Sequence, residues 1–432
     1  MTAEIVIMNK EAVALAADSA VSLVTGPAEN PQKIFTSANK IFRLSRNHTV
    51  AFMIYNNAAF LGIPWEPLIT RFGDSLGSSP LPALADYTGR FLHFLKDEEE
   101  LITADIEKQY FTSMIYTYYH SFRQIFQQNS LEIIRVQGVI SEDQVGDIVA
   151  EKINEIYTQI MSAESVSGID QSLIKDLTKA YDEILTKAIT EVFEQLPIPD
   201  PTRVQLKEIP FIFFEKFSGT LDPMVQNFSG IVVVGFGEKE IFPSLVTYAV
   251  EGRLAGTLKY REIENKKITL ETGAYVIPFA QREMVDIFMS GIDPRLTDAL
   301  VESLTEIFHE YPQAIVDSIE TMNDDEKTHL KTQFQPQSDD LIARISTYID
   351  NYRASNTIPI INVVISLPKT ELAAMAESLV NLTSLKRKVS LQAETVGGPV
   401  DVAVLSKRDG FVWIRRKQYF KEELNQHIML RD

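Results

Sequence analysis

The pattern of apolar and polar positions predicts that the chain begins with a β-hairpin. Residues 3–8 are rich in strand-forming side chains, residues 9–11 are typical of a turn, and residues 12–17 form a second, more apolar run. A period of two puts Asp18 on the face of the small residues of that run, opposite the face of Leu15. Two further strands and a helix are expected at residues 40–44, at residues 50–55 and after Pro64.

Apolar residues recur at helical spacing from about residue 80 to residue 197, which predicts a long helical region. Residues 110–126 are crowded with aromatic side chains. Such a stripe could line a ligand groove, but we expect it to form core or an interface. The proline-rich run at residues 197–201 is expected to end this region.

Strand patterns return after this region. They are expected at residues 211–214, 230–237, 244–250 and 254–262. The elements predicted after them are helices at 279–290 and 294–311, a polar helical stretch at 312–354, a buried strand at 360–367, a helix at 370–384, and strands at 401–405 and 410–414. Strands and helices grouped in this order predict a layered α+β fold rather than a regular βαβ winding.

Composition narrows the classes of partner and cofactor. The 432 residues include 41 Lys and Arg against 59 Asp and Glu, a net charge of −18, and no cysteine. Phosphate binding needs concentrated positive charge, so nucleic acid and anionic membrane surfaces are poor candidate partners. No signal peptide or membrane-spanning segment is recognisable, which predicts a soluble cytoplasmic protein. The six histidines lack metal-ligand spacing and no nucleotide-binding motif is present, so we expect no metal and no cofactor.

Candidate chemistry is concentrated at the start of the chain. A small residue after Met1 normally allows Met1 to be removed, and Thr2 would then carry a hydroxyl and a free α-amine. The amine, with a reference pKa of about 7.7–8.0, can act as the base for the hydroxyl. Asp18 ends an apolar strand and needs a partner, for which Lys33 and Lys40 are the candidates.

Lys40 is the better partner for Asp18, because alternation points it inward, whereas Lys33 follows a loop and is expected at the surface. An inward Asp–Lys pair beside Thr2 could set the charge state of a catalytic site. An ion pair that only supports the hairpin would explain the same two residues.

The front of the chain resembles the family of proteasome β-subunits and HslV. The resemblance is carried by Thr2 with its following strand, by residues 15–19 (Leu-Ala-Ala-Asp-Ser) and by residues 39–44 (Asn-Lys-Ile-Phe-Arg-Leu). It implies that Thr2 is the nucleophile, Asp18, followed by Ser19, the orienting carboxylate, and Lys40 the proton-handling lysine. The backbone N–H of Asn57, or of Asn56, would stabilise the oxyanion.

Weaker similarities follow later in the chain. They are a Gly-aromatic-Gly turn at 235–237, a strand-to-helix junction at 271–280, a double-glycine turn at 394–402 and a closing hairpin at 407–413. Ala274 stands where the family's serine near the nucleophile is expected. Glu394 and Thr395 could replace the family's Asp and Ser before the double glycine.

The resemblance implies a four-layer α/β/β/α sandwich. Its core would comprise residues 1–73, 206–312 and 358–432, with helical insertions at 74–205 and 313–357. The expected function is that of a threonine peptidase or amidase acting through Thr2, as a homo-oligomer. A non-catalytic assembly or binding module of the same fold and a small-amide hydrolase are the alternatives. Replacing Lys40 with Ala is expected to abolish turnover and leave folding largely intact.

Overall fold

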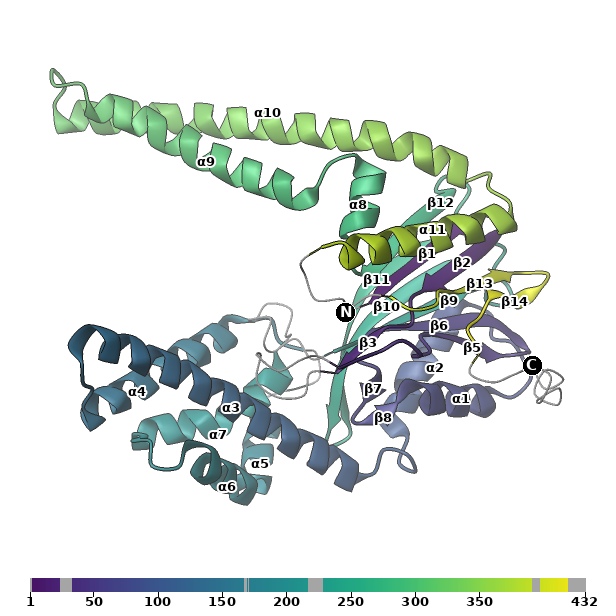
Figure 1. Ribbon diagram of the computed structural model, residues 1–432, viewed down its shortest axis with the longest axis horizontal. Coiled ribbons are helices and arrows are strands. Elements are labelled where there is room, and N and C mark those ends of the chain that lie inside the picture. Colours follow the sequence, from purple (N-terminus) through teal and green to yellow (C-terminus); the bar gives the residue numbers. More distant parts are fainter. Residues whose placement is uncertain are drawn as a thin grey trace.

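The computed structural model describes residues 2–23, 33–166, 169, 171–216, 228–390 and 397–418 of a mixed α+β chain (Figure 1). Two five-stranded antiparallel sheets form its centre. The first has the order β12-β1-β2-β13-β14, with β1 Ala3–Asn9, β2 Ala12–Ala17, β12 Ala274–Ala280, β13 Asp401–Ser406 and β14 Gly410–Arg415. The second has the order β11-β10-β9-β6-β5, with β5 Ile41–Ser45, β6 His48–Asn56, β9 Ser229–Gly235, β10 Ser244–Leu254 and β11 Thr257–Lys267.

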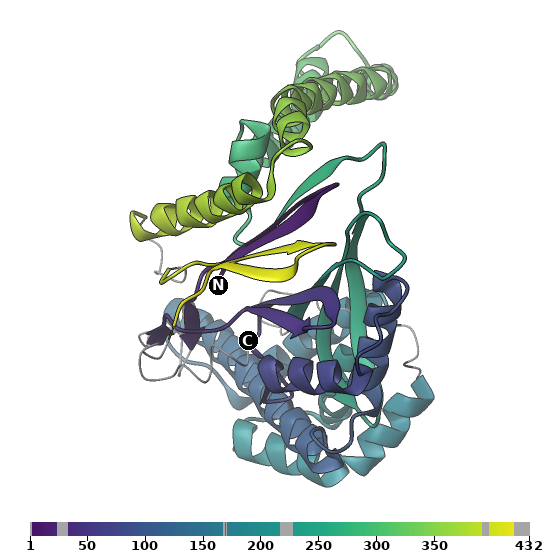
Figure 2. The same cartoon turned by 90° about the vertical axis from the view of Figure 1, so that its right-hand side faces the viewer.

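The two sheets pack face to face, and each has helices on its outer face (Figures 1 and 2). Apolar side chains at alternate positions of the strands fill the space between the sheets, among them Val13, Leu15 and Val232. Helices α8 (Glu283–Ser290) and α11 (Lys369–Lys388) pack against the first sheet, on the face that carries the small residues of β2. Helices α1 (Trp65–Leu76) and α2 (Leu84–Asp97) cover the second sheet. Two short hairpins pair β3 (Val21–Leu23) with β4 (Lys33–Phe35), and β7 (Ala59–Phe60) with β8 (Ile63–Pro64).

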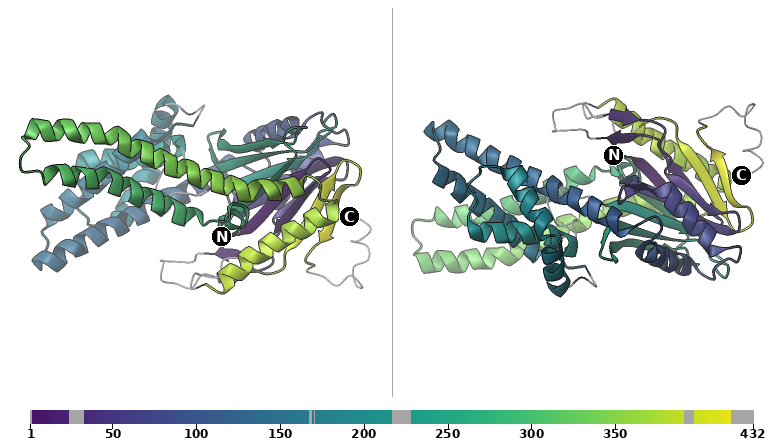
Figure 3. Two further views of the ribbon diagram at one scale, coloured as in Figure 1. Left: turned by 90° about the horizontal axis from the view of Figure 1, so that it is seen from above. Right: turned by 90° about the horizontal axis from the view of Figure 1, so that it is seen from below.

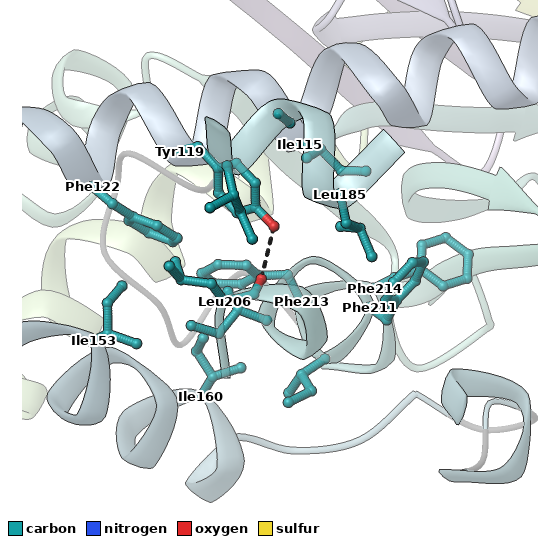
Figure 4. Close-up of a cluster of buried hydrophobic side chains, with 14 of the residues drawn as sticks. Ile115, Tyr119, Phe122, Ile153, Ile160, Leu185, Leu206, Phe211, Phe213 and Phe214 are labelled. Atoms are coloured by element: carbon teal, nitrogen blue, oxygen red, sulfur yellow. Dashed lines mark hydrogen bonds between the residues drawn. The ribbon is translucent and has the colours of Figure 1, made fainter. Parts of the chain in front are cut away.

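A helical lobe extends from the second sheet and has a core of its own (Figure 4). It comprises α3 (Ala104–Gln137), α4 (Glu142–Ser162), α5 (Gln171–Ala180), α6 (Asp182–Phe193) and α7 (Asp200–Glu215). The aromatic residues of α3 pack inside the lobe, where the buried hydroxyl of Tyr119 donates a 2.9 Å hydrogen bond to the carbonyl of Leu206. The expectation that these aromatics form core is confirmed.

A long helical hairpin forms a second projection. It consists of α9 (Pro294–Asp317) and α10 (Asp324–Val364), which pack against each other. The hairpin and the lobe extend from the same end of the sheets, the end at which β1 begins (Figures 1 and 3). The start of the chain therefore lies at the base of both projections.

Several predicted elements are wrong, and each error involves an apolar or proline-containing segment. Residues 211–214 are the last turn of α7, and residues 360–367 include the end of α10 rather than a strand. The helix expected at 279–290 begins only at Glu283, because β12 continues through Ala280. Prolines near residue 200 do not end the helical region, since Pro201 lies in the first turn of α7, where its missing N–H costs nothing.

Candidate active site

Asp18 and Lys40 form a buried ion pair at the end of the sheets where β1 begins. Asp18 follows β2 of the first sheet, Lys40 precedes β5 of the second, and their residues are 1 % and 4 % exposed. Lys40 Nζ donates to Asp18 Oδ1 at 2.5 Å. The carboxylate also accepts backbone N–H groups from Ala3 at 3.0 Å, Gly397 at 2.8 Å and Ala20 at 3.3 Å. This number of donors satisfies a buried carboxylate. The predicted pairing with Lys40 is confirmed; the side chain of Lys33 lies outside the described residues.

Thr2 is held at the same place by its backbone. Its carbonyl accepts a 3.1 Å hydrogen bond from the N–H of Gln281, and the next residue, Ala3, pairs with Ala280 of β12. The Thr2 hydroxyl is buried and has no hydrogen-bond partner among the residues that the structure describes. A buried hydroxyl without a partner costs free energy, so its retention calls for an explanation.

A pocket of about 210 Å³ brings three predicted site residues together. Thr2, Lys40 and Asn57 all line it. Asn56 lines it as well and has φ of 65°, a left-handed conformation that asparagine tolerates better than most residues. The N–H of Asn57 donates to the carbonyl of Phe228 at 3.4 Å, a long hydrogen bond. The nucleophile candidate, the lysine and the candidate oxyanion donor therefore face one cavity.

Ser19 is not among the residues that line this pocket. Ser19 is fully buried, and its hydroxyl donates to the carbonyl of Pro399 at 2.6 Å, while its N–H donates to Gly397 at 3.2 Å. These bonds attach the double-glycine turn to the end of β2. Glu394, with Thr395, lies outside the described residues.

Ala274 is not near the nucleophile, so the expectation that it replaces a catalytic serine is wrong. The register of β1 and β12 pairs Ala274 with Asn9, at the opposite end of β1. The residue that follows β12 beside Thr2 is Gln281, whose side-chain oxygen accepts from Arg387. The sequence of residues 272–274 alone could not show which end of β12 lies beside Thr2, because that depends on how β12 pairs with β1.

Glu4 is a site residue that the sequence analysis missed. It lies two residues after Thr2 on the same strand face, is 2 % exposed, and neither carboxyl oxygen has a hydrogen-bond partner among the described residues. Burial raises the pKa of Glu4 from 4.5 to about 8. The positive charge of Lys40 lowers this pKa in part, and the charge of Asp18 raises it further. At pH 7, Glu4 therefore places a neutral carboxyl group next to Thr2 on the same face of the strand.

One sequence signal could have identified Glu4. In residues 3–8 it is the single charged side chain, on the face that Val6 and Met8 direct into the space between the sheets. A carboxylate at such a position must be protonated, paired or functional.

Comparison with known proteins identified no similar protein. No known protein family matches the sequence, and no curated protein matches it. Within the described residues, no group of three or more His, Asp or Glu side chains is placed to hold a metal ion. None of the described helices is both long enough and apolar enough to cross a membrane.

Proposed function

We propose that this chain is an N-terminal-nucleophile hydrolase that cleaves peptide bonds through the hydroxyl of Thr2. The observation that carries the proposal is a buried hydroxyl that has no hydrogen-bond partner among the described residues and lines a pocket beside a buried Lys–Asp pair. We further propose that the two helix-covered sheets are the four-layer sandwich of the proteasome-like family. The position of Thr2, at the start of an inner strand of the first sheet, agrees with that assignment.

Cleavage of the Met1–Thr2 bond would create the base. The freed α-amine has a reference pKa of about 7.7–8.0, so a sizeable fraction is neutral at pH 7.5 and can accept a proton. Thr2 Oγ1 attacks the substrate carbonyl and its proton passes to the amine, which then protonates the leaving nitrogen. Water hydrolyses the resulting ester, and Thr2 recovers its proton.

Lys40 and Asp18 would set the electrostatics of this step. The lysine is held by Asp18 at 2.5 Å and lines the same pocket as Thr2. A fixed positive charge stabilises the developing negative charge on Thr2 Oγ1 and on the oxyanion. The N–H of Asn57 would exchange its long bond to Phe228 for the substrate oxyanion.

A non-catalytic binding module is the alternative, and the role of Asp18 as a structural anchor favours it. Its carboxylate binds backbone groups of three segments as well as Lys40, so the pair could be retained for stability alone. In that case the hydroxyl of Thr2 would be dispensable, whether or not Met1 is removed.

Intact-mass spectrometry before and after incubation with a peptide epoxyketone separates these functions. This reagent forms its stable adduct only where a hydroxyl and a free α-amine share one residue. We expect loss of Met1 and a single adduct, absent from Thr2→Ala. Thr247→Ala is the matched control, because Thr247 is a second buried hydroxyl without a partner among the described residues. Retained Met1, or an adduct that persists in Thr2→Ala, would contradict the proposal.

A further inference from the structure

A second pocket adjoins the Thr2 pocket. Its volume is about 140 Å³. The two pockets share Asn39, Phe42 and Glu66 in their linings, so they lie side by side. The side chains that distinguish the second pocket are those of Arg43, Trp413 and Arg416.

The second pocket is lined by two arginines although the whole chain carries −18. Among its lining residues, Glu66 is the one acidic residue beside Arg43 and Arg416. Arg43 is half-buried on β5 and has no ion-pair partner among the described residues. Arg416 lies over the ring of Trp413, with its guanidinium carbon 5.0 Å from the ring centroid, which fixes its orientation.

We propose that this second pocket binds a carboxylate of the substrate, so that the hydrolase prefers peptides with an acidic group near the bond that is cut. A planar guanidinium matches a carboxylate with two parallel hydrogen bonds. Arg43, which is half-buried and has no ion-pair partner in the described part of the chain, is available to make them. The inference rests on the proposed function, because it assumes that Thr2 marks the bond that is cut.

The spacing along the chain sets the position of the acidic group. Lys40 lines the Thr2 pocket, and Arg43 lies three residues further along extended backbone, about 10 Å away at about 3.3 Å per residue. An extended peptide covers this distance in about three residues. The carboxylate is therefore expected two to three residues from the bond that is cut, either as an Asp or Glu side chain or as the C-terminus of the peptide.

Binding to the Thr2→Ala protein tests the subsite without requiring catalysis. Fluorescein-labelled peptides of one sequence would carry Glu or Gln at the second and third positions, each with a free or amidated C-terminus, and anisotropy would be measured. We expect the Glu peptides to bind at least about tenfold more tightly than the Gln peptides. If only the free C-terminus matters, the terminal carboxylate is the group that is bound.

Three substitutions test which side chains are responsible. Arg43→Gln should remove the preference for the acidic peptide and leave binding of the Gln peptide unchanged, and Arg43→Lys should restore only part of it. Glu66→Gln removes the opposing charge and should strengthen binding of the acidic peptide several-fold. Thermal unfolding of each variant checks that it is folded.

The outcomes separate this inference from the proposed function. Equal binding of Glu and Gln peptides, no measurable binding of either, or an unchanged preference in a folded Arg43→Gln protein would overturn the subsite. An Arg43-dependent preference in a protein whose Thr2 forms no epoxyketone adduct would uphold the carboxylate site and reject the hydrolase.

Discussion

Lys40 Nζ lies 2.5 Å from Asp18 Oδ1, and this contact connects the two sheets at the end where Thr2 starts β1. The partners are 22 positions apart in sequence and lie next to strands of different sheets, Asp18 after β2 and Lys40 before β5. Because Asp18 also binds three backbone N–H groups, the pair fixes the positions of β1, β2 and the turn at Gly397 relative to Lys40. The same two residues thus influence both stability and the proposed chemistry.

Lys40→Met should destabilise the protein by about 3–5 kcal/mol, because it leaves the carboxylate of Asp18 buried without a cation. The structure therefore argues against the expectation that Lys40 can be replaced without affecting folding. Urea unfolding would measure the change. The control is Lys187→Met, whose partner Glu191 lies 3.7 Å away at the surface, and which should cost at most about 0.5 kcal/mol. Equal effects of the two substitutions would contradict this account.

The front of the fold could be predicted because its sequence signals are local. Residues 3–8 and 12–17 are two strand-forming runs separated by a turn, as a hairpin requires. An aspartate that ends an apolar strand must find a cation. Of the two candidate lysines, Lys40 was the one whose side chain the strand pattern directs to the interior. The lobe core was also predictable, because the aromatic residues of α3 repeat at helical spacing.

The errors arose where the answer depends on distant parts of the chain. The runs 211–214 and 360–367 are short and apolar, and such runs occur equally in buried strands and at the buried ends of helices. Ala274 was misplaced because only the pairing of β12 with β1 shows which end of β12 lies near Thr2. Glu4 was overlooked because a single polar residue in a strand normally points to solvent, and here both strand faces are covered.

Thr2→Val should leave stability unchanged or raise it by up to about 1 kcal/mol, because it removes a buried hydroxyl that has no partner among the described residues. Ser19→Ala is the contrasting substitution. It breaks the 2.6 Å bond to the carbonyl of Pro399 and should cost about 1–3 kcal/mol. Thermal unfolding would compare the two. A large loss of stability in Thr2→Val would show that the hydroxyl has a structural role, which would weaken the assignment of Thr2 as a nucleophile.

Arg253→Met should loosen the attachment of the helical lobe to the second sheet. Arg253 is 5 % exposed, pairs with Glu107 at the start of α3, and donates to backbone carbonyls between the end of α2 and α3. These are the carbonyls of Leu95, Lys96, Glu98 and Ile102. Loss of this guanidinium leaves Glu107 and the carbonyls without their partner, which should lower the stability of the folded protein by about 3–5 kcal/mol.

Limited proteolysis would show whether Arg253 has this role. In Arg253→Met the connection between α2 and α3 should be cut several times faster than in the native protein, whereas the exposed control Arg90→Met should not differ from it. Unchanged cleavage would mean that the packing of the lobe, rather than Arg253, holds this connection.

Glu4→Gln should stabilise the protein increasingly as the pH rises. Burial raises the pKa of Glu4 from 4.5 in the unfolded chain to about 8 in the folded protein. Below pH 4.5 the group is protonated in both states and contributes no pH dependence. Between these values the unfolded chain has lost the proton that the folded protein keeps, so stability falls as the pH rises; above pH 8 the loss from Glu4 is complete.

The variant lacks this loss, so its gain in stability over the native protein should be small at pH 4.5 and reach on the order of 5 kcal/mol at pH 9. Urea unfolding at several pH values would measure the difference, with Glu66→Gln, an exposed carboxylate, as the control that should show no such trend. If native and Glu4→Gln proteins lose stability in parallel over this range, another group takes up the proton. Glu4 would then be ionised beside Thr2 and could itself accept the proton of the hydroxyl, so the same titration also decides which base the proposed reaction can use.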